Sequence, residues 1–375
     1  MRSPSAGLVE DSSSARFRPV RDGTPLGATQ PVGGLQMSQA NANHPDPNAG
    51  TGPDLPGQGR HQPVMVGEVV SILSPVPAGI MVDATVGDGG HAAAMLEANT
   101  RLFLLGLDRD PAAIVSASRR LERYRDRVAL EQLSFDQLAV AACPLAAAKG
   151  LPVTAVLFDL GVRSDQLDDA QRGFSYRHDG PLDMRMDSTQ ALTAADVVNG
   201  WSESELASLF AANGEGRFCH RLARAVVAAR PLSSTTELAQ VVASALPASV
   251  RREPGHPARR VFQAVRVAVN SELEMLRPAL GEALSLLAPG GRCVVLSYHS
   301  GEDRIVKAVF KEAETGGCSC PPKLPCHCGA QRRARLLFRS SRRPSALEVE
   351  SNPRASSARM RALERLGANE SRLGS

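Results

Sequence analysis

The sequence predicts a doubly wound α/β fold, in which helices cover both faces of a parallel sheet, interrupted by a helical insertion. Short apolar runs alternate with helical segments between residues 79 and 159, and this alternation is typical of parallel sheets. From about 165 to 257 only helix signals occur, and a further apolar run at 292–297 then resumes the sheet. The insertion should lie beside the carboxyl ends of the strands, where such sheets bind ligands.

Composition sets the class of protein but not its partner. The chain has 375 residues, of which 43% are hydrophobic, enough for one large α/β domain with an insertion. A net charge of +4 is compatible with an RNA partner and equally with an ordinary enzyme. No apolar run reaches the roughly 18 residues that cross a bilayer, and the N-terminal residues do not show the charged-then-apolar pattern of a signal peptide. Cys143, Cys219 and Cys293 stand singly in apolar segments, so we expect no disulfide framework and a reducing cytoplasm.

Five segments follow one another along the chain. Residues 1–58 are rich in Pro, Gly, Ser, Asn and Asp and are predicted to be a disordered tail. Residues 59–164 form the first part of the α/β domain, 165–257 the helical insertion, and 258–345 the second part of the α/β domain. Residues 346–375 are interpreted as a basic surface tail.

The elements are assigned from apolar periodicity and from start and stop signals. Strands are predicted at 79–83, 102–107, 128–132, 153–158 and 292–297, with a short last strand at 335–339. Helices are predicted near 61–73, at 91–98 and at 111–124, where Pro111 occupies the first turn. In the insertion, Ser202 with Glu205 and Ser234 with Glu237 fit the capping box. One long amphipathic helix is predicted from Val261 to Leu276, and another between Pro278 and the Ala288–Gly291 stop.

The sharpest local motif joins the first strand to its helix, with Asp83 followed by a glycine-rich turn that ends at His91. Glycines let the backbone approach a ligand, and the helix N-terminus offers free N–H groups. Asp108 closes the second strand, where a carboxylate meets a ribose diol. The turn departs from G-x-G-x-x-G, and by itself it leaves open a dinucleotide site, an adenosylmethionine site or a tight turn that binds nothing.

Two later segments add polar residues at the same edge of the predicted sheet. The fourth strand leads into Asp159 and Gln166, and a loop rich in Gly, Pro and charge follows at 172–187. The fifth strand leads into His299 and Glu302. A solvated linker and a surface loop would have the same compositions. Ser300 and His299 are a poor catalytic pair because adjacent residues on a strand point to opposite faces.

A fourth motif consists of cysteines, as Cys318-x-Cys320 and Cys326-x-Cys328 with His327 between the last two. Four thiolates so close in sequence suit a structural zinc ion. The spacing is not C-x2-C, however, and a flexible, redox-sensitive loop is the alternative. The sequence therefore assigns no metal ligands.

Together these stretches resemble one family, the bacterial 16S ribosomal RNA cytosine-N4 methyltransferases, from His61 to about Leu366. The matching stretches are DATVGDGGH, LGLDRDPAA, DLGVRSDQLDDAQRGFSYRHDGPLDMRMD, HPARRVFQAVRVAVNSELE, LAPGGRCVVLSYHSGEDRIVK and SNPRASSARMRALER. The resemblance implies a class I, Rossmann-like methyltransferase domain with an inserted helical domain that helps to hold RNA. It also implies S-adenosylmethionine as cofactor and 16S RNA of the small ribosomal subunit as partner. The residues themselves give no evidence of an obligatory protein partner, and the cysteine pattern predicts the cytoplasmic location.

The resemblance also assigns site residues by position. Cofactor contacts fall on Gly89, Gly90, His91, Asp108 at the ribose, Phe135 against the adenine, Asp159 and Gln166. This chain departs from the family pattern at Arg163 and Gly301, neither of which is among those contacts.

Catalysis requires a hydrogen-bond acceptor for the cytosine amine, whose lone pair is drawn into the ring. Candidates by location are Asp159, Asp183 and His299, together with Asp179. Candidates for phosphate contacts are Arg172, Arg177, Arg185, Arg259 and Arg260. The fourth strand is not followed by the Asn/Asp-Pro-Pro-Tyr/Phe motif of many amine methyltransferases. That the cytosine amine is the atom that receives the methyl group therefore rests on the resemblance. Three rival functions stay open: a nicotinamide-dependent oxidoreductase, a methyltransferase for a protein, another RNA or a small molecule, and a non-catalytic ribosome-assembly factor.

Overall fold

The structure is a computed structural model that describes residues 63–252, 256–321, 327–367 and 370. These residues lie in a compact unit that begins at Gly59. The predicted disordered tail, 1–58, lies outside the described residues. None of the helices in the described ranges is long and apolar enough to cross a membrane.

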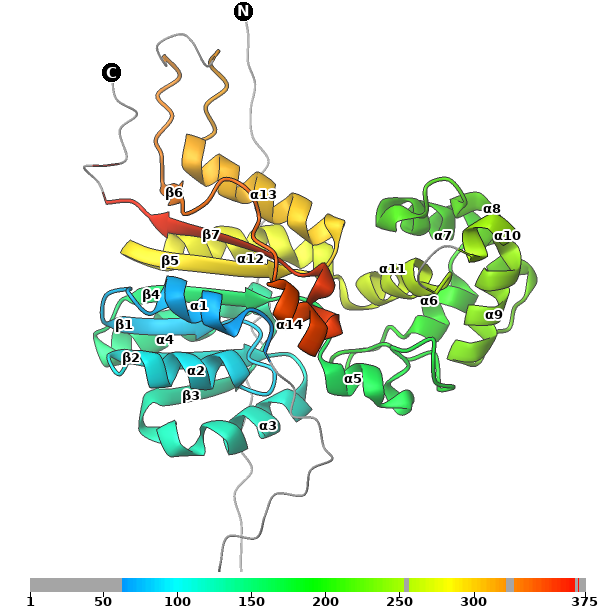
Figure 1. Ribbon diagram of the computed structural model, residues 1–375, viewed down its shortest axis with the longest axis horizontal. Helices are drawn as coiled ribbons and strands as arrows, with labels where there is room; N and C mark the ends of the chain where they lie inside the picture. Colours follow the sequence, from blue (N-terminus) through cyan, green and yellow to red (C-terminus); the bar gives the residue numbers. More distant parts are fainter. Residues whose placement is uncertain (1–62, 253–255, 322–326, 368–369, 371–375) are drawn as a thin grey trace, which may run out of the picture. The chain divides into compact units, whose positions relative to one another are not determined.

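A mixed sheet of seven strands runs through the described part of the chain, in the order β3-β2-β1-β4-β5-β7-β6 (Figure 1). The strands are β1 (Gly79–Asp83), β2 (Leu102–Asp108), β3 (Val128–Gln132), β4 (Val153–Asp159), β5 (Leu287–Ser297), β6 (Ala334–Leu336) and β7 (Arg359–Arg365). Strands β1 to β5 pair in parallel, and β7 pairs antiparallel with both β5 and β6. The five parallel strands confirm the predicted α/β class.

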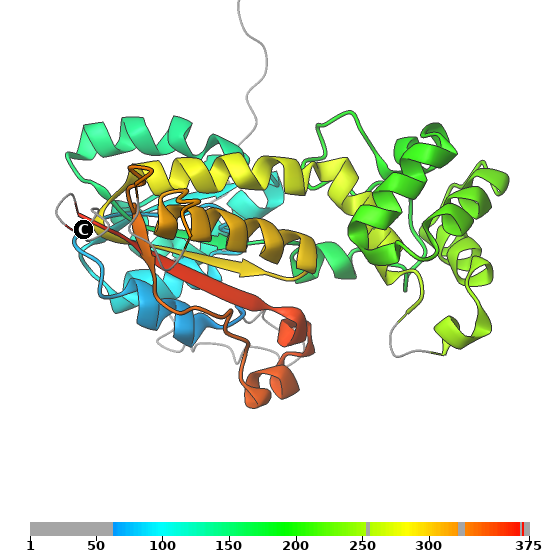
Figure 2. The same ribbon diagram turned by 90° about the horizontal axis from the view of Figure 1, so that it is seen from above.

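Helices cover both faces of this sheet (Figure 2). One face carries α1 (Val66–Leu73), α2 (Gly90–Ala98) and α3 (Pro111–Leu121), and the other carries α4 (Leu138–Lys149), α12 (Glu272–Leu286) and α13 (Ser300–Thr315). Alternate residues of β4 serve the two layers, because successive strand side chains point to opposite faces. Ala155 and Leu157 pack with the first group of helices, and Val156 and Phe158 with the second.

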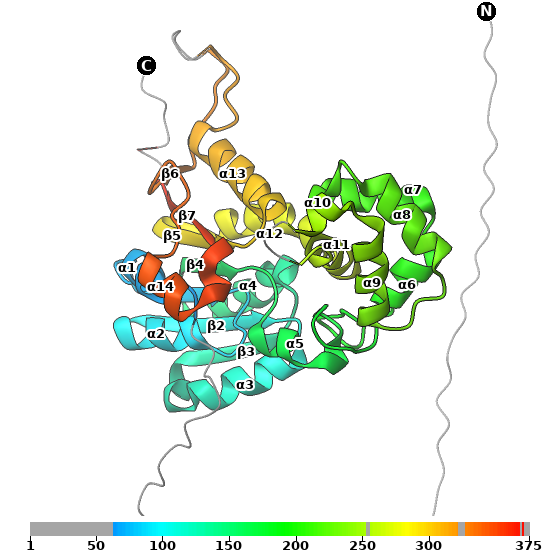
Figure 3. The ribbon, with the colours of Figure 1, turned by 45° about the vertical axis from the view of Figure 1, so that its right-hand side comes forward.

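The insertion has a hydrophobic core of its own, around which its helices pack (Figure 3). Its helices are α5 (Ser164–Asp168), α6 (Ala194–Gly200), α7 (Glu203–Phe210), α8 (Cys219–Ala228), α9 (Thr235–Ala245), α10 (Ala248–Arg251) and α11 (Arg259–Asn270). Both predicted capping boxes are present, at Ser202 and Ser234. The core extends to Val269, so by packing α11 belongs with the insertion, past the boundary predicted at residue 257.

The long helix predicted from Val261 to Leu276 is two helices. Ser271 adopts a left-handed backbone with φ 50° between α11 and α12. Beside this break, Arg266 forms a bidentate ion pair with Glu272 at 2.8 Å. Asn270 holds the break to the loop before α6, since its side-chain amide donates to Met184 O at 2.7 Å and accepts from Met186 N at 2.9 Å. Pro278 lies inside α12 and does not begin a new helix.

The predicted surface tail, 346–375, is the clearest error of the sequence interpretation. Helix α14 (Ala346–Ser351) and the turn η5 (Pro353–Ser357) lead into β7, which occupies the place between β5 and β6. Met360, Ala362 and Leu363 are fully buried there. Arginines at 359, 361 and 365 gave the segment a solvated composition, but only alternate side chains of a sheet strand need to be apolar, and Arg361 pairs with Asp303 at 2.7 Å.

Candidate active site

A cavity of about 550 Å³ lies at the carboxyl ends of the parallel strands. Its walls include the turn after β1, the ends of β2, β4 and β5, and side chains from α11 of the insertion. This is the place at which open α/β sheets bind their ligands. Of the predicted cofactor contacts, six line it: Gly90, His91, Asp108, Phe135, Asp159 and Gln166.

The glycine turn after β1 brings backbone close to this cavity. Gly87 has a left-handed φ of 51° and its N–H donates to Asp108 Oδ2 at 3.0 Å. A Cβ at Gly90 would lie 2.5 Å from the ring of Pro63, so only glycine fits beside that residue. Gly89, the remaining predicted contact, is not among the lining residues. Its Cβ position faces Leu121 of α3, which makes Gly89 a packing position.

Asp108 ends β2 with a carboxylate on the cavity wall. Its Oδ1 accepts from Asp110 N at 2.9 Å while its Oδ2 accepts from Gly87 N. Burial raises the pKa of Asp108, an effect that these backbone bonds and the nearby Arg163 oppose. A carboxylate so fixed can accept hydrogen bonds from a vicinal diol.

Behind Asp108, buried Asp110 organises the loops after β2 and β4. Asp110 Oδ2 accepts from Gln166 Nε2 at 2.8 Å and from Arg172 at 3.2 Å, and lies 3.4 Å from Arg163 Nη2. Gln166 in turn accepts from Arg163 N at 3.1 Å. Arg172, a predicted phosphate contact, is thus committed to the protein interior. Asp110 was not among the predicted site residues, although an aspartate directly before the proline that begins a helix is typical of an N-cap, as Asp110 is for α3.

Asp159, the last residue of β4, is held on the wall by residues that follow β1 and β5. Its backbone N–H donates to Thr85 Oγ1 at 2.7 Å, and its Oδ1 accepts from the hydroxyl of Tyr298 at 2.7 Å. Burial and the Asp159 carboxylate together raise the pKa of Tyr298 well above its usual value, so the phenol stays a donor. Sequence analysis assigned Tyr298 no function, and only its place before His299 at the end of β5 pointed to it.

His91 connects the glycine turn to the same carboxylate. Its Nε2 lies 2.9 Å from the Val64 carbonyl, which can only accept, so Nε2 carries the hydrogen. The other nitrogen, Nδ1, lies 3.6 Å from Asp159 Oδ2. His91 is therefore a buried link between the segment before α1 and Asp159.

His299 lines the cavity, but one ring nitrogen is hydrogen-bonded and the other is buried beside Glu302. Its Nδ1 accepts from Gly301 N at 3.2 Å as the N-cap of α13, and its Nε2 lies 3.0 Å from Glu302 Oε1. Glu302 also accepts from Tyr298 N at 2.7 Å. Despite burial, the neighbouring His299 and Arg266 hold the pKa of Glu302 below its usual value. This arrangement fixes the start of α13 and leaves His299 no nitrogen for a substrate.

Two other proposed acceptors are not on the cavity wall. Asp183 forms a bidentate ion pair with Arg185, at 2.7 Å for the shortest contact. Hydrogen bonds from Ser234 and Thr236 lower the pKa of Asp179, which is fully exposed. Neither residue lines the cavity. Because Arg185 is held in this ion pair, its charge is already paired and it is a poor candidate for a phosphate contact.

The mouth of the cavity carries the two remaining arginines of interest. Arg177 and Arg259 both line it, whereas Arg260 does not and lies 3.5 Å from Glu215. Tyr176 and His256 also line the cavity, and their rings stack with centroids 4.4 Å apart. Aromatic faces beside cations are suited to an unstacked base and its phosphates.

The C-terminal segment also contributes to the cavity wall. Residues from Asn352 to Ser357 contribute lining atoms, and Arg354 pairs with Asp168 of α5 at 2.6 Å. Phe135 adds an aromatic ring, edge-on to Phe158 at 6.1 Å between centroids. The sequence matched this C-terminal stretch to a family without predicting that it reaches the site.

These features define a class of protein. A glycine turn, a carboxylate after the second strand and an aromatic ring on the wall fit a nucleoside-containing cofactor in a doubly wound sheet. The cavity extends past this part to Asp159, Tyr298 and the arginines, so a second reactant can approach the same space. The fold and site are those of an α/β transferase that uses such a cofactor.

Comparison with known proteins identifies the family. A model described as the MraW methylase family matches residues 58–366, and the chain belongs to that family. This confirms the resemblance drawn from the sequence.

Relatives of this chain are identical to it at nearly half of the aligned positions. Proteins named ribosomal RNA small subunit methyltransferase H are 49% identical in Thermobifida fusca (81% of this chain, 93% of that protein) and 48% in Acidothermus cellulolyticus (85% and 97%). The one from Heliobacterium modesticaldum is 45% identical, covering 82% of this chain and 98% of that protein. Among solved structures, an rRNA methylase from Streptococcus thermophilus aligns over 80% of this chain and 94% of its own, with 13% identity and a TM-score of 0.36.

Proposed function

We propose that this protein methylates the exocyclic amine of a cytidine in 16S ribosomal RNA of the small subunit, with Asp159 as the acceptor of the amine's hydrogen bond. The methyl donor is S-adenosylmethionine, and the substrate class is small-subunit ribosomal RNA, as in the named relatives. One observation supports the proposal above all others. A single cavity joins the Asp108 carboxylate to Asp159 and to the cations Arg177 and Arg259.

The cofactor end of the cavity is suited to adenosylmethionine. Asp108 would hold the ribose hydroxyls, and Phe135 would contact the adenine. The turn from Gly87 to His91 would contact the rest of the cofactor through its backbone, which lies close to the cavity wall. When bound, adenosylmethionine supplies an electrophilic methyl group on a sulfonium.

Asp159 is the best placed of the four acceptor candidates. Its carboxylate lines the cavity, and its Oδ1 is fixed by the hydroxyl of Tyr298. Accepting a hydrogen bond from the cytosine amine would orient the nitrogen lone pair toward the cofactor, and alignment is the main requirement of such a displacement. Asp179 and Asp183 lie off the wall, and His299 has one ring nitrogen bonded to Gly301 N and the other buried beside Glu302.

The RNA end must admit an unstacked base. Extruding a nucleotide costs a few kcal/mol, which contacts to the base and flanking phosphates offset. Arg177 and Arg259 supply positive charge at the mouth, and Tyr176 with His256 supplies aromatic faces.

The test is transfer of labelled methyl groups to small subunits from cells that lack this protein, followed by nucleoside mass analysis. We expect label in N4-methylcytidine. Asp159→Asn should lower kcat by about 10²- to 10⁴-fold, the usual range for general acid–base groups. Because Asp159 is also a predicted cofactor contact, adenosylhomocysteine binding should weaken as well, but by a smaller factor than kcat falls. Asp126→Asn removes an exposed carboxylate outside the cavity and should leave both quantities unchanged.

The rival functions predict other outcomes in the same assay. Label in protein or in another nucleoside would replace the proposed substrate, and subunit binding without label would indicate an assembly factor. Tighter binding of NAD than of adenosylhomocysteine would indicate an oxidoreductase. An Asp159→Asn variant with full kcat would remove the proposed acceptor.

A further inference from the structure

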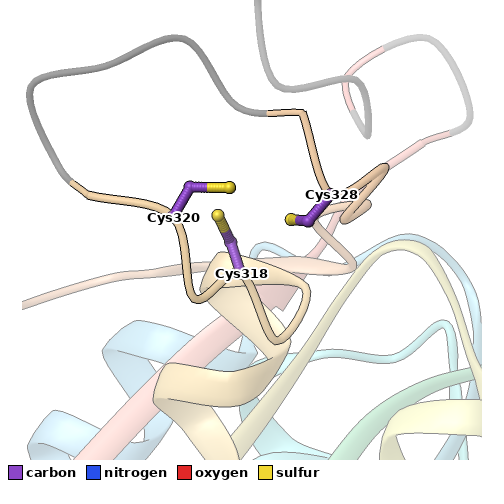
Figure 4. A group of neighbouring side chains, drawn as sticks. All are labelled: Cys318, Cys320 and Cys328. Carbon is purple, nitrogen blue, oxygen red and sulfur yellow. The ribbon is translucent and has the colours of Figure 1, made fainter.

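Three cysteine side chains converge in the loop between α13 and β6, away from the cavity. The sulfur atoms of Cys318, Cys320 and Cys328 all lie within 4.8 Å of one another, and the three side chains point into one space (Figure 4). Cys326, which completes the sequence pattern, lies outside the described residues, and the site inferred below consists of the other three.

The base of this loop is closed by backbone contacts that bring its two legs together. Gly316 ends α13 with a left-handed φ of 65°, and a Cβ there would lie 2.3 Å from the carbonyl oxygen of Gln331. Arg333 N donates to Ala313 O at 2.8 Å. Cys318 and Cys328 are ten positions apart in sequence, and this closure lets their side chains meet.

Beyond its base, the described part of the loop does not pack into a hydrophobic core. No described residue from 316 to 333 is buried: Cys318 and Cys320 are half-exposed and Cys328 is exposed. Ordering such a segment costs roughly 1–2 kcal/mol of backbone entropy per residue. Segments too small to bury a core are usually stabilised by disulfides or by a metal ion.

The arrangement of the three sulfur atoms favours a metal ion over a disulfide. A tetrahedral zinc site has Zn–S bonds of about 2.3 Å, which places its sulfur atoms about 3.8 Å apart. Sulfur atoms within 4.8 Å of one another reach that geometry by moving about an ångström or less. A disulfide uses two sulfur atoms at about 2 Å and leaves the third as an accessible, oxidisable thiol.

We propose that Cys318, Cys320 and Cys328 bind a structural zinc ion that fixes the loop between α13 and β6. Each thiol gives up its proton on binding, so occupancy falls as the pH is lowered. The fourth coordination position is taken by a further protein donor or by water. None of the residues described between 316 and 333 lines the cavity, so the ion holds the loop and has no part in methyl transfer.

The test measures metal in the full chain, purified under reducing conditions and without a histidine tag. Elemental analysis should find about one zinc ion per chain. Replacement of the zinc by Co²⁺ should give the strong sulfur-to-metal charge-transfer absorption of thiolate ligands. Cys320→Ser and Cys328→Ser should each weaken zinc binding by more than about 100-fold, because even outer partners of a metal ligand account for about 10- to 100-fold.

Cys143→Ser is the matched control, because Cys143 is an exposed cysteine on α4, outside the cluster. It should retain full zinc content and cobalt absorption. Chelation should expose the loop to limited proteolysis in the wild-type chain and in the control. Two results would overturn the proposal: a reduced chain that takes up neither zinc nor Co²⁺ through sulfur, or mass analysis showing two of the three cysteines joined in a disulfide in the chain as isolated.

Discussion

At the scale of single residues, the site is built from groups that hold one another before any ligand binds. The hydroxyl of Tyr298 donates to Asp159, the backbone of Gly87 and Asp110 holds Asp108, and Glu302 fixes the turn after β5. Such preorganisation matters in a displacement reaction because catalysis depends on alignment.

Tyr298→Phe tests whether the hold on Asp159 matters for turnover. Loss of a hydrogen bond to a charged group costs about 1.5–3 kcal/mol, so kcat should fall by about 10- to 100-fold. KM for both substrates should change little, because the hydroxyl orients Asp159 and is not proposed to bind RNA. Steady-state kinetics on small subunits measures this split. A rise in KM at constant kcat would instead make Tyr298 a binding residue.

Arg259→Ala tests the phosphate contact at the mouth of the cavity. RNA affinity should fall and the slope of log K against log salt should decrease by about one, while adenosylhomocysteine binding should stay unchanged. Arg224→Ala is the control, since Arg224 is an exposed arginine of the same insertion and does not line the cavity. Filter binding over a range of salt concentrations measures both. Equal slopes for the two variants would contradict the proposed contact.

At the scale of elements, β7 changes the interpretation of the C-terminus. The strand adds to the edge of the parallel sheet in the opposite direction and buries Met360 completely. The segment before it, from Asn352 to Ser357, forms part of the cavity wall. The C-terminal residues therefore support both the sheet and the site.

Met360→Ala should lower the free energy of unfolding by about 2–5 kcal/mol, the range for deleting a large buried side chain. Leu347→Ala removes a side chain that is 78% exposed on the same C-terminal segment and should change stability by less than about 0.5 kcal/mol. Chemical denaturation measures both variants. Similar midpoints for the two would mean that β7 adds little to the stability of the sheet.

At the scale of the whole molecule, one buried carboxyl group makes stability depend on pH. Asp83 ends β1 and is 1% exposed. Burial, together with the charges of Asp159 and Asp108, raises its pKa to about 8. The folded chain therefore keeps a proton on Asp83 at neutral pH, whereas the unfolded chain loses it near pH 4.

The sign follows from proton linkage. The folded state holds the extra proton between about pH 4 and pH 8, so this contribution to stability is complete below that window and is lost as the pH rises through it. The slope approaches about 1.4 kcal/mol per pH unit. Asp83→Asn should flatten the decline, as measured by denaturation midpoints from pH 5 to pH 9. Parallel pH profiles for wild type and variant would contradict the raised pKa.

The sequence by itself determined the α/β class, the parallel strands β1 to β5, the capped helices of the insertion and the family. These rest on local signals: apolar runs, capping boxes, a glycine turn and motif order. It also placed Asp108 and Asp159 at the ends of parallel strands, which meet at one edge of the sheet.

Only the tertiary structure decided which polar residues meet. Asp159 and Asp183 are equally acidic in sequence, but one lies on the cavity wall and the other pairs with Arg185. Arg259 lines the cavity and has no ion-pair partner among the described residues, whereas Arg172 pairs with Asp110, and β7 is a strand despite its arginines. The physical reason is common to all three: the partner that neutralises a charge or buries a strand comes from a distant segment, and local composition does not encode that pairing.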